Sequence, residues 1–139
     1  MPAKDFYHDN VVAALTADGW TITDDPLYLS SGKRDLWVDL GAERNTIGAE
    51  KAGQRIAVEI KSFLSKSPVD DLQDAIGQYQ MYRELLVDSE PDRTLYLAVP
   101  KSAWTGIFSE ELGQLMVERL HLRVIVFELK KERIIKWIS

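Results

Sequence analysis

Residues 56–62 read Ile-Ala-Val-Glu-Ile-Lys-Ser, and this stretch predicts a strand at the centre of a sheet. Its three large aliphatic residues alternate with smaller or charged ones at a period of two, as they do along a half-buried strand. The alternation places Glu59 and Lys61 side by side on the other face. Because burying an acid and an amine is costly without partners, two interpretations stay open. The charges form a functional pair, or they lie incidentally on a solvated face.

The composition predicts one globular domain over residues 1–139. Hydrophobic residues make up 45% and charged residues 28%, which excludes an intrinsically disordered chain. No apolar run approaches the ~20 residues of a membrane-spanning helix, and the first residues lack the apolar core of a secretory signal. We therefore expect a cytoplasmic protein without membrane contact. The absence of cysteine excludes disulfides, zinc–thiolate sites and thiol nucleophiles.

The net charge of −5 argues against a protein that coats nucleic acids, because such proteins are basic overall. It leaves room for an enzyme that touches nucleic acid through a local basic patch. Two short basic segments, at 33–34 and 130–133, could contact phosphates or could be charged turns that keep the protein soluble.

Periodicity and turn residues predict an α/β fold, in which helices pack on a mixed sheet and a β-hairpin closes the chain. The helix that follows the central strand has a strong start signal, with Ser67 as N-cap and Pro68 at the first helical position. Helices are expected at 4–17, 68–86 and from about 109, and strands at 20–23, 27–29, 36–40, 46–51, 56–62, 94–99, 124–129 and 133–138.

Asp39 and Glu59 project from two predicted strands that are close enough in sequence to be neighbours in one sheet. If both carboxylates face the same side, they form a paired site with the carbonyl of Ile60 between them. Hard oxygen ligands of this kind suit Mg²⁺, with Mn²⁺ as the alternative, and the metal then binds phosphate. Lys61 would orient a water molecule or stabilise the phosphorus centre as charge develops.

Gln78 and Tyr82 lie four residues apart on the predicted helix and therefore share one face. That face is rotated from the apolar stripe, so we expect both side chains at the rim of the sheet. They either belong to the site or form a half-exposed pair without a role.

This combination resembles the PD-(D/E)xK nuclease superfamily: Asp39, then Glu-x-Lys at 59–61, then Gln-x-x-x-Tyr at 78–82, the last as in its RecB-type branch. More narrowly, most of the chain is similar to the XisH family. The segments that carry this resemblance are 18–23, 39–43, 49–51, 56–63, 77–79 and 95–100.

The resemblance implies a restriction-endonuclease-like fold and a role in DNA rearrangement. The XisH family is named for a cyanobacterial factor that controls excision of the fdxN DNA element during heterocyst development, together with XisI and a site-specific recombinase. The resemblance thus implies DNA, an XisI-like protein and a recombinase as partners, and a Mg²⁺-dependent endonuclease-like site at Asp39, Glu59, Lys61, Gln78 and Tyr82. The alternative is a non-catalytic accessory protein that binds XisI or the recombinase.

Two departures from the superfamily pattern leave further acids open. Val38 stands where a proline would precede the first acid, and the gap between Asp39 and Glu59 is long. The second acid could instead be Glu43 or Glu50, and an acid from the first helix could be Asp5 or Asp9.

The remaining candidates have weaker signals. His8 and His121 lack metal-ligand spacing, so we expect surface or capping roles for them. The four tryptophans are expected in the core, although tryptophan can also stack on bases. The C-terminal hairpin at 124–138 is more apolar than a free sheet edge should be, which predicts a homodimer or a partner at that edge.

Overall fold

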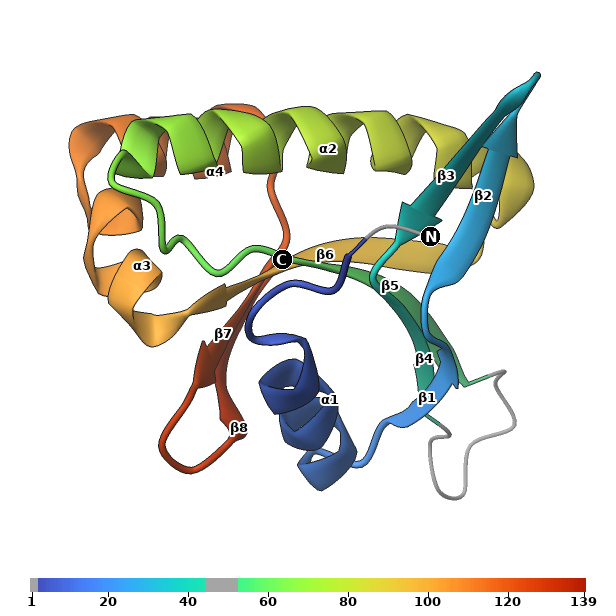
Figure 1. The fold of residues 1–139 in the computed structure, drawn as a ribbon, viewed down its shortest axis with the longest axis horizontal. Helices are drawn as coiled ribbons and strands as arrows, with labels where there is room; N and C mark the ends of the chain where they lie inside the picture. Colours follow the sequence, from blue (N-terminus) through green and yellow to red (C-terminus); the bar gives the residue numbers. More distant parts are fainter. Residues whose placement is uncertain (1–2, 45–52) are drawn as a thin grey trace.

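The computed structural model describes residues 3–44 and 53–139. Within these residues, a six-stranded sheet has the order β1-β4-β5-β6-β7-β8, and β2 and β3 form a separate two-stranded sheet (Figure 1). Along the chain the elements are α1 (His8–Ala17), β1 (Thr21–Asp24), β2 (Leu27–Ser31), β3 (Arg34–Val38), β4 (Leu40–Arg44), β5 (Gln54–Ile60), α2 (Pro68–Ser89), β6 (Arg93–Pro100), α3 (Lys101–Thr105), η1 (Ile107–Ser109), α4 (Glu111–Arg119), β7 (Val124–Glu128) and β8 (Arg133–Ile138).

The predicted α/β fold is confirmed: the sheet is mixed, helices flank it, and β7 and β8 form the C-terminal hairpin. Strands β5, β6 and β7 run parallel, and α2 connects β5 to β6. The start of α2 is also as predicted, since the Ser67 side chain accepts a hydrogen bond from the Asp70 N–H at 3.1 Å and Pro68 is the first helical residue. No helix in the described residues is long and apolar enough to cross a membrane.

The sheet separates two hydrophobic cores. α1 packs on one face, and α2 lies across the other (Figure 1). Strand β5 contributes to both cores and is buried from Ile56 to Ile60, including Glu59, which is 5% exposed. The interpretation that placed Glu59 on a solvated face is therefore wrong, because α2 covers that face of β5.

The predicted strand at 36–40 is in fact two strands. β3 ends at Val38 and pairs with β2, whereas β4 begins at Leu40 and pairs with β1 and β5. Asp39 lies at the junction, where the chain passes from the small sheet to the large one. The change of partner explains the break, because one continuous strand could not belong to both sheets.

Two other predicted features differ from the structure. The predicted strand at 46–51 lies outside the described residues, and within them the antiparallel partner of β5 is β4. The helix expected from about 109 begins at Glu111, as α4, and its Leu112 and Leu115 are 41% and 38% exposed. Met116 packs against the core.

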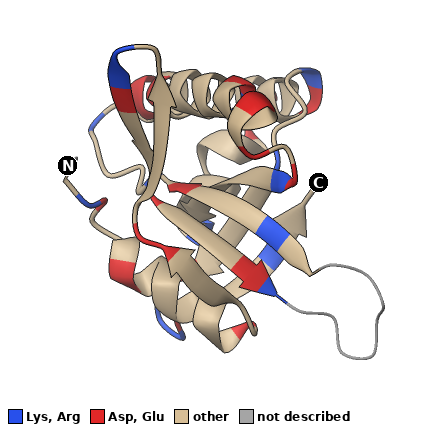
Figure 2. Ribbon diagram, turned by 90° about the vertical axis from the view of Figure 1, so that its right-hand side faces the viewer, with Lys and Arg blue, Asp and Glu red and all other residues tan. Residues whose placement is uncertain are grey.

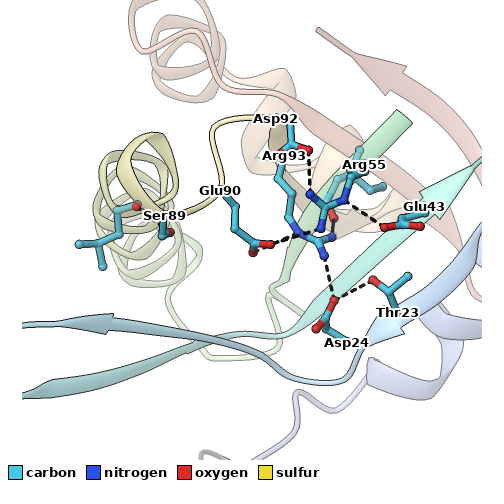
Figure 3. Close-up of polar contacts among 10 residues, drawn as sticks. Thr23, Asp24, Glu43, Arg55, Ser89, Glu90, Asp92 and Arg93 are labelled. Carbon is cyan, nitrogen blue, oxygen red and sulfur yellow. Dashed lines mark hydrogen bonds and ion pairs between the residues drawn. The ribbon is translucent and has the colours of Figure 1, made fainter. Parts of the chain in front are cut away.

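A buried arginine joins three segments at the start of β5 and β6 (Figure 3). Arg93, whose side chain is 2% exposed, donates hydrogen bonds to the Ile56 carbonyl at 2.9 Å, to Asp24 at 2.9 Å and to Glu90 at 3.1 Å. Two carboxylates and a carbonyl thereby compensate the guanidinium, as a buried charge requires. Gly41 leaves the space for this contact.

We predict that Gly41→Ala destabilises the protein by about 1–3 kcal/mol. A Cβ at this position would lie 2.7 Å from Asp24 Oδ2 and 2.8 Å from Arg93 Nη1, so the ion pair would have to move. The control is Gly77→Ala on the exposed side of α2, where a Cβ meets nothing within 4 Å. That change should stabilise the helix by about 0.5–1 kcal/mol. Urea unfolding measures both, and equal effects at the two glycines would contradict the packing described for Gly41.

Candidate functional site

A cavity of about 180 Å³ lies at the carboxyl end of β5, where the chain leaves the sheet. It is lined by seven residues that the sequence singled out as site candidates and by two others. The seven are Asp5, Asp39, Glu59, Ile60, Lys61, Gln78 and Tyr82, and the others are Ala3 and Trp37. The fold therefore brings together residues from the β3–β4 junction, from β5 and from α2.

Two reciprocal hydrogen bonds hold the β3–β4 junction against the end of β5. Asp39 Oδ2 accepts a hydrogen bond from the Ile60 N–H at 2.7 Å, and Glu59 Oε1 accepts one from the Asp39 N–H at 3.3 Å. The Asp39 carboxylate thus takes the place of a strand partner for Ile60. As a result, the two carboxyl groups lie next to each other at the cavity.

The cavity has a strongly negative electrostatic environment. Burial, followed by the neighbouring Asp39 carboxyl group, raises the pKa of Glu59 to about 10. Burial, followed by the negative charges of Glu59 and Asp39, raises the pKa of Tyr82 to about 12. Both shifts have the same consequence: the site favours a proton or a cation beside its carboxylates.

Lys61 provides a positive charge at the edge of the same cavity. Its backbone N–H is bonded to the Ala98 carbonyl at 3.0 Å, which keeps the residue in line with β5 after the strand ends. Its Nζ lies 3.8 Å from Asp74 on α2, whose side chain is 69% exposed. An ion pair of this length with an exposed partner contributes little stability.

Helix α2 supplies the other wall. Tyr82 is buried and Gln78 is exposed, and both line the cavity, in agreement with the expectation that they share one face at the rim of the sheet. Tyr79 belongs to the core stripe instead, and its hydroxyl donates a hydrogen bond to the Leu95 carbonyl at 3.3 Å.

Of the two acids proposed near the first helix, the structure brings Asp5 to the cavity. Its carboxylate accepts hydrogen bonds from the N–H groups of Tyr7 at 2.8 Å and Ser62 at 3.1 Å, and its negative charge also raises the pKa of Glu59. Asp9 is exposed in the first turn of α1 and does not line the cavity.

Of the alternative second acids, Glu43 does not line the cavity. Glu43 lies at the far end of β4 and forms an ion pair with Arg55 at 3.0 Å. Glu50 lies outside the described residues.

Sequence reasoning missed two residues of the site and misplaced one histidine. Trp37 lines the cavity. The sequence contained a signal for this position, because the alternation along the predicted strand places Trp37 on the same side as Asp39. Asp74 had no such signal. His8 is not at the surface: it is 3% exposed, and its Nε2 lies 2.7 Å from Asp25 Oδ1. The expected core position is confirmed for Trp20.

The donor set of the cavity fits a divalent metal that keeps most of its water ligands. No group of three or more acidic or histidine side chains within residues 3–44 and 53–139 is arranged to hold a metal ion. Mg²⁺, however, commonly takes only one or two protein carboxylates. Asp39 and Glu59 would hold it, and a bound cation would favour the charged form of Glu59, which burial and the neighbouring Asp39 carboxyl group disfavour.

The fold and the cavity define a mixed α/β protein in which a buried carboxyl group, Glu59, lies beside a half-buried one, Asp39, at the end of the central strand. The family model described as XisH protein matches residues 1–135, and the chain therefore belongs to the XisH family. No curated protein matches the sequence significantly.

Two solved structures are similar over nearly the whole chain. A crystal structure of an XisH family protein from Nostoc punctiforme PCC 73102 has a TM-score of 0.88 and 36% sequence identity, and the match covers 97% of this chain and 100% of that one. A crystal structure of an fdxN element excision controlling factor protein from Anabaena variabilis has a TM-score of 0.86 and 38% identity, with 98% and 100% of the two chains covered.

We predict that Glu59→Gln stabilises the metal-free protein at alkaline pH. Folding raises the pKa of Glu59 from an ordinary value of 4.5 to about 10, so between these values the folded state holds a proton that the unfolded state has lost. Stability therefore falls as pH rises, and glutamine removes this loss. In EDTA, the free energy of unfolding of Glu59→Gln should exceed that of wild type by more than about 1 kcal/mol at about pH 8. The difference should shrink toward about pH 4.5.

Denaturant unfolding across this pH range measures the difference. The matched control is Glu43→Gln, which removes an exposed, arginine-paired carboxylate. A Glu59→Gln variant less stable than wild type at alkaline pH would contradict the described electrostatics.

Proposed function

We propose that this protein controls excision of a DNA element, and that it does so by cleaving DNA phosphodiesters with Mg²⁺, or Mn²⁺, at the Asp39–Glu59 cavity. The observation that carries the proposal is the cavity in which the buried Glu59, the half-buried Asp39 and Lys61 meet. The similar Anabaena variabilis protein is an fdxN element excision controlling factor, which supports the biological role. The order of the motifs along the chain, which resembles PD-(D/E)xK nucleases, supports the chemistry.

Four of the residues that line the cavity would act at the metal and the phosphate. Asp39 and Glu59 would hold the metal, and the carbonyl of Ile60, the last residue of β5, would be a further ligand. When bound, the metal supplies Lewis-acid polarisation of the scissile phosphate. Lys61 orients the attacking water and stabilises the negative charge that develops on phosphorus. Water forms the new bond to phosphorus as the bond to the leaving sugar oxygen breaks.

The two cavity residues on α2, Gln78 and Tyr82, position other groups and do not act on the reacting atoms. Gln78 is exposed at the cavity rim, where its amide can bond to the DNA backbone. Tyr82 is buried beside the carboxylates, and its high pKa keeps the hydroxyl protonated as a donor at neutral pH. Both residues would therefore orient the substrate and the acids.

We predict that Lys61→Ala lowers metal-dependent cleavage of supercoiled and branched DNA by about 100-fold or more, because it removes the charge that stabilises the transition state. Glu59→Gln should remove cleavage and also the rise in melting temperature that Mg²⁺ gives to wild type. Lys66→Ala is the control, since Lys66 is an exposed lysine a few residues further along the same loop. Gel assays with and without the XisI-like partner measure cleavage, and calorimetry measures the melting temperature.

Full activity in Lys61→Ala would contradict the site assignment. Absence of cleavage in every condition, with partner binding intact in all variants, would favour the second candidate function.

The second candidate is an accessory protein that binds an XisI-like protein or the recombinase through a sheet edge. β8 ends the strand order and carries Ile135, which is 39% exposed. An edge strand presents unpaired backbone groups to another chain. The net charge of −5 also favours this candidate, because DNA phosphates repel an acidic protein.

If two copies pair through β8, light scattering at micromolar concentration should give twice the monomer mass of 15.8 kDa. Ile135→Lys should then shift the mass toward the monomer, because a charge at the edge opposes strand pairing. A monomer in the wild type at these concentrations would contradict the homodimer and leave β8 free for a different chain.

A further inference from the structure

The hairpin of β2 and β3 stands outside the main sheet and has two chemically different faces (Figure 1). Leu27, Leu29 and Val38 lie on the inner face and belong to the core that α2 covers. The alternation of a β-strand turns Tyr28 and Trp37 to the outer face. The inner face thus fixes the hairpin to the domain and leaves the outer face available for contact.

The outer face joins the candidate site directly. Tyr28 pairs with Trp37 across the two strands, and their ring centroids are 5.9 Å apart. Trp37 lines the carboxylate cavity, whereas Tyr28 is 53% exposed further along the hairpin. Two neighbouring aromatic rings therefore extend from the cavity to the solvent.

The hairpin ends in a basic turn. Gly32, with a φ of 58°, and Lys33 form the two-residue loop between Ser31 and Arg34, and glycine suits the positive φ. Lys33 and Arg34 are both exposed. Figure 2 shows basic and acidic residues together at this end of the hairpin, as the sequence Lys-Arg-Asp at 33–35 requires.

Asp35 limits the positive charge of the turn and positions the exposed ring. Its carboxylate accepts a hydrogen bond from the Tyr28 hydroxyl at 2.6 Å, which holds the ring on the outer face. The turn therefore carries two positive charges and one negative charge, so electrostatic attraction to phosphates is weak and ring stacking would supply most of the binding.

We propose that the outer face of the β2–β3 hairpin binds single-stranded DNA and leads it into the cavity, with bases stacked on Tyr28 and Trp37 and phosphates at Lys33 and Arg34. This inference rests on the proposed function and names its substrate class. Unpaired bases expose both of their ring faces, whereas bases in a duplex stack on one another and cannot use such a platform. The cavity beside Trp37 then receives the DNA backbone.

The test is fluorescence anisotropy with a labelled oligodeoxythymidine in EDTA, so that no cleavage occurs. Tyr28→Ala should bind about ten-fold or more weakly than wild type, because it removes one stacking ring. Tyr28→Phe keeps the ring and loses only the bond to Asp35, so it should bind nearly as wild type. If Tyr28 acted only through its hydrogen bond to Asp35, both variants would bind equally weakly.

Charge and strand state give two more readouts. Replacing Lys33 and Arg34 by alanine should make DNA binding less dependent on salt concentration. In the wild type, two phosphate contacts should give a slope of log binding constant against log salt concentration that is no steeper than about −1.5. The matched control replaces Lys130 and Lys131, a basic turn between β7 and β8, and should leave binding unchanged. A duplex of matched length should bind more weakly than the single strand.

The outcomes separate this inference from the proposed function. Glu59→Gln should retain single-strand binding while losing cleavage, so a wild type that binds but never cleaves overturns only the catalytic proposal. Equal binding by wild type and Tyr28→Ala, tighter binding of the duplex, or no binding of the single strand would each overturn the role of the hairpin, even if cleavage occurs.

Discussion

The contact between Asp39 and the end of β5 is the constraint on which the rest of the site depends. At this point the chain leaves the β2–β3 hairpin and enters the main sheet. The Asp39 carboxylate replaces a strand partner for the Ile60 N–H, and the Asp39 N–H binds the Glu59 carboxylate. One junction therefore ends one sheet, begins another and brings two acids together. The same junction connects the β2–β3 hairpin to the main sheet beside the cavity.

The charged side chains at the two ends of β5 differ in whether they have partners of opposite charge. At its start, Arg93 and Arg55 meet the carboxylates of Asp24, Glu90 and Asp92, so each charge has a partner (Figure 3). At its end, Glu59 lies beside Asp39, and burial, followed by the Asp39 carboxyl group, raises the pKa of Glu59 to about 10. Compensated charge is typical of a structural network, whereas uncompensated charge costs stability and is commonly retained where a ligand or a reaction uses it. This contrast supports placing the function at the carboxyl end.

Membership of the XisH family and the likeness to two crystal structures confirm the XisH resemblance of the sequence. The motif residues could be identified because each has a chemical signature: an acid on a strand, a Glu-x-Lys pair, and a glutamine and tyrosine four residues apart. Arg93 and Asp74 could not be identified, because a single arginine or aspartate near a helix gives no local signal of its partner. His8 was misplaced for the same reason, since its partner Asp25 is 17 residues away.

The sequence by itself determined the elements with a clear period or cap: the buried strand at 56–60, the helix that Ser67 caps, and the hairpin of β7 and β8. These follow from local rules, because side chains repeat every two residues in strands and every 3.6 residues in helices. Only the tertiary structure decided which acids meet. Asp39 and Glu43 are four residues apart, yet one reaches Glu59 and the other reaches Arg55, since β4 runs antiparallel to β5 and carries them to opposite ends. Strand pairing and the burial it creates are long-range properties, and no local pattern contains them.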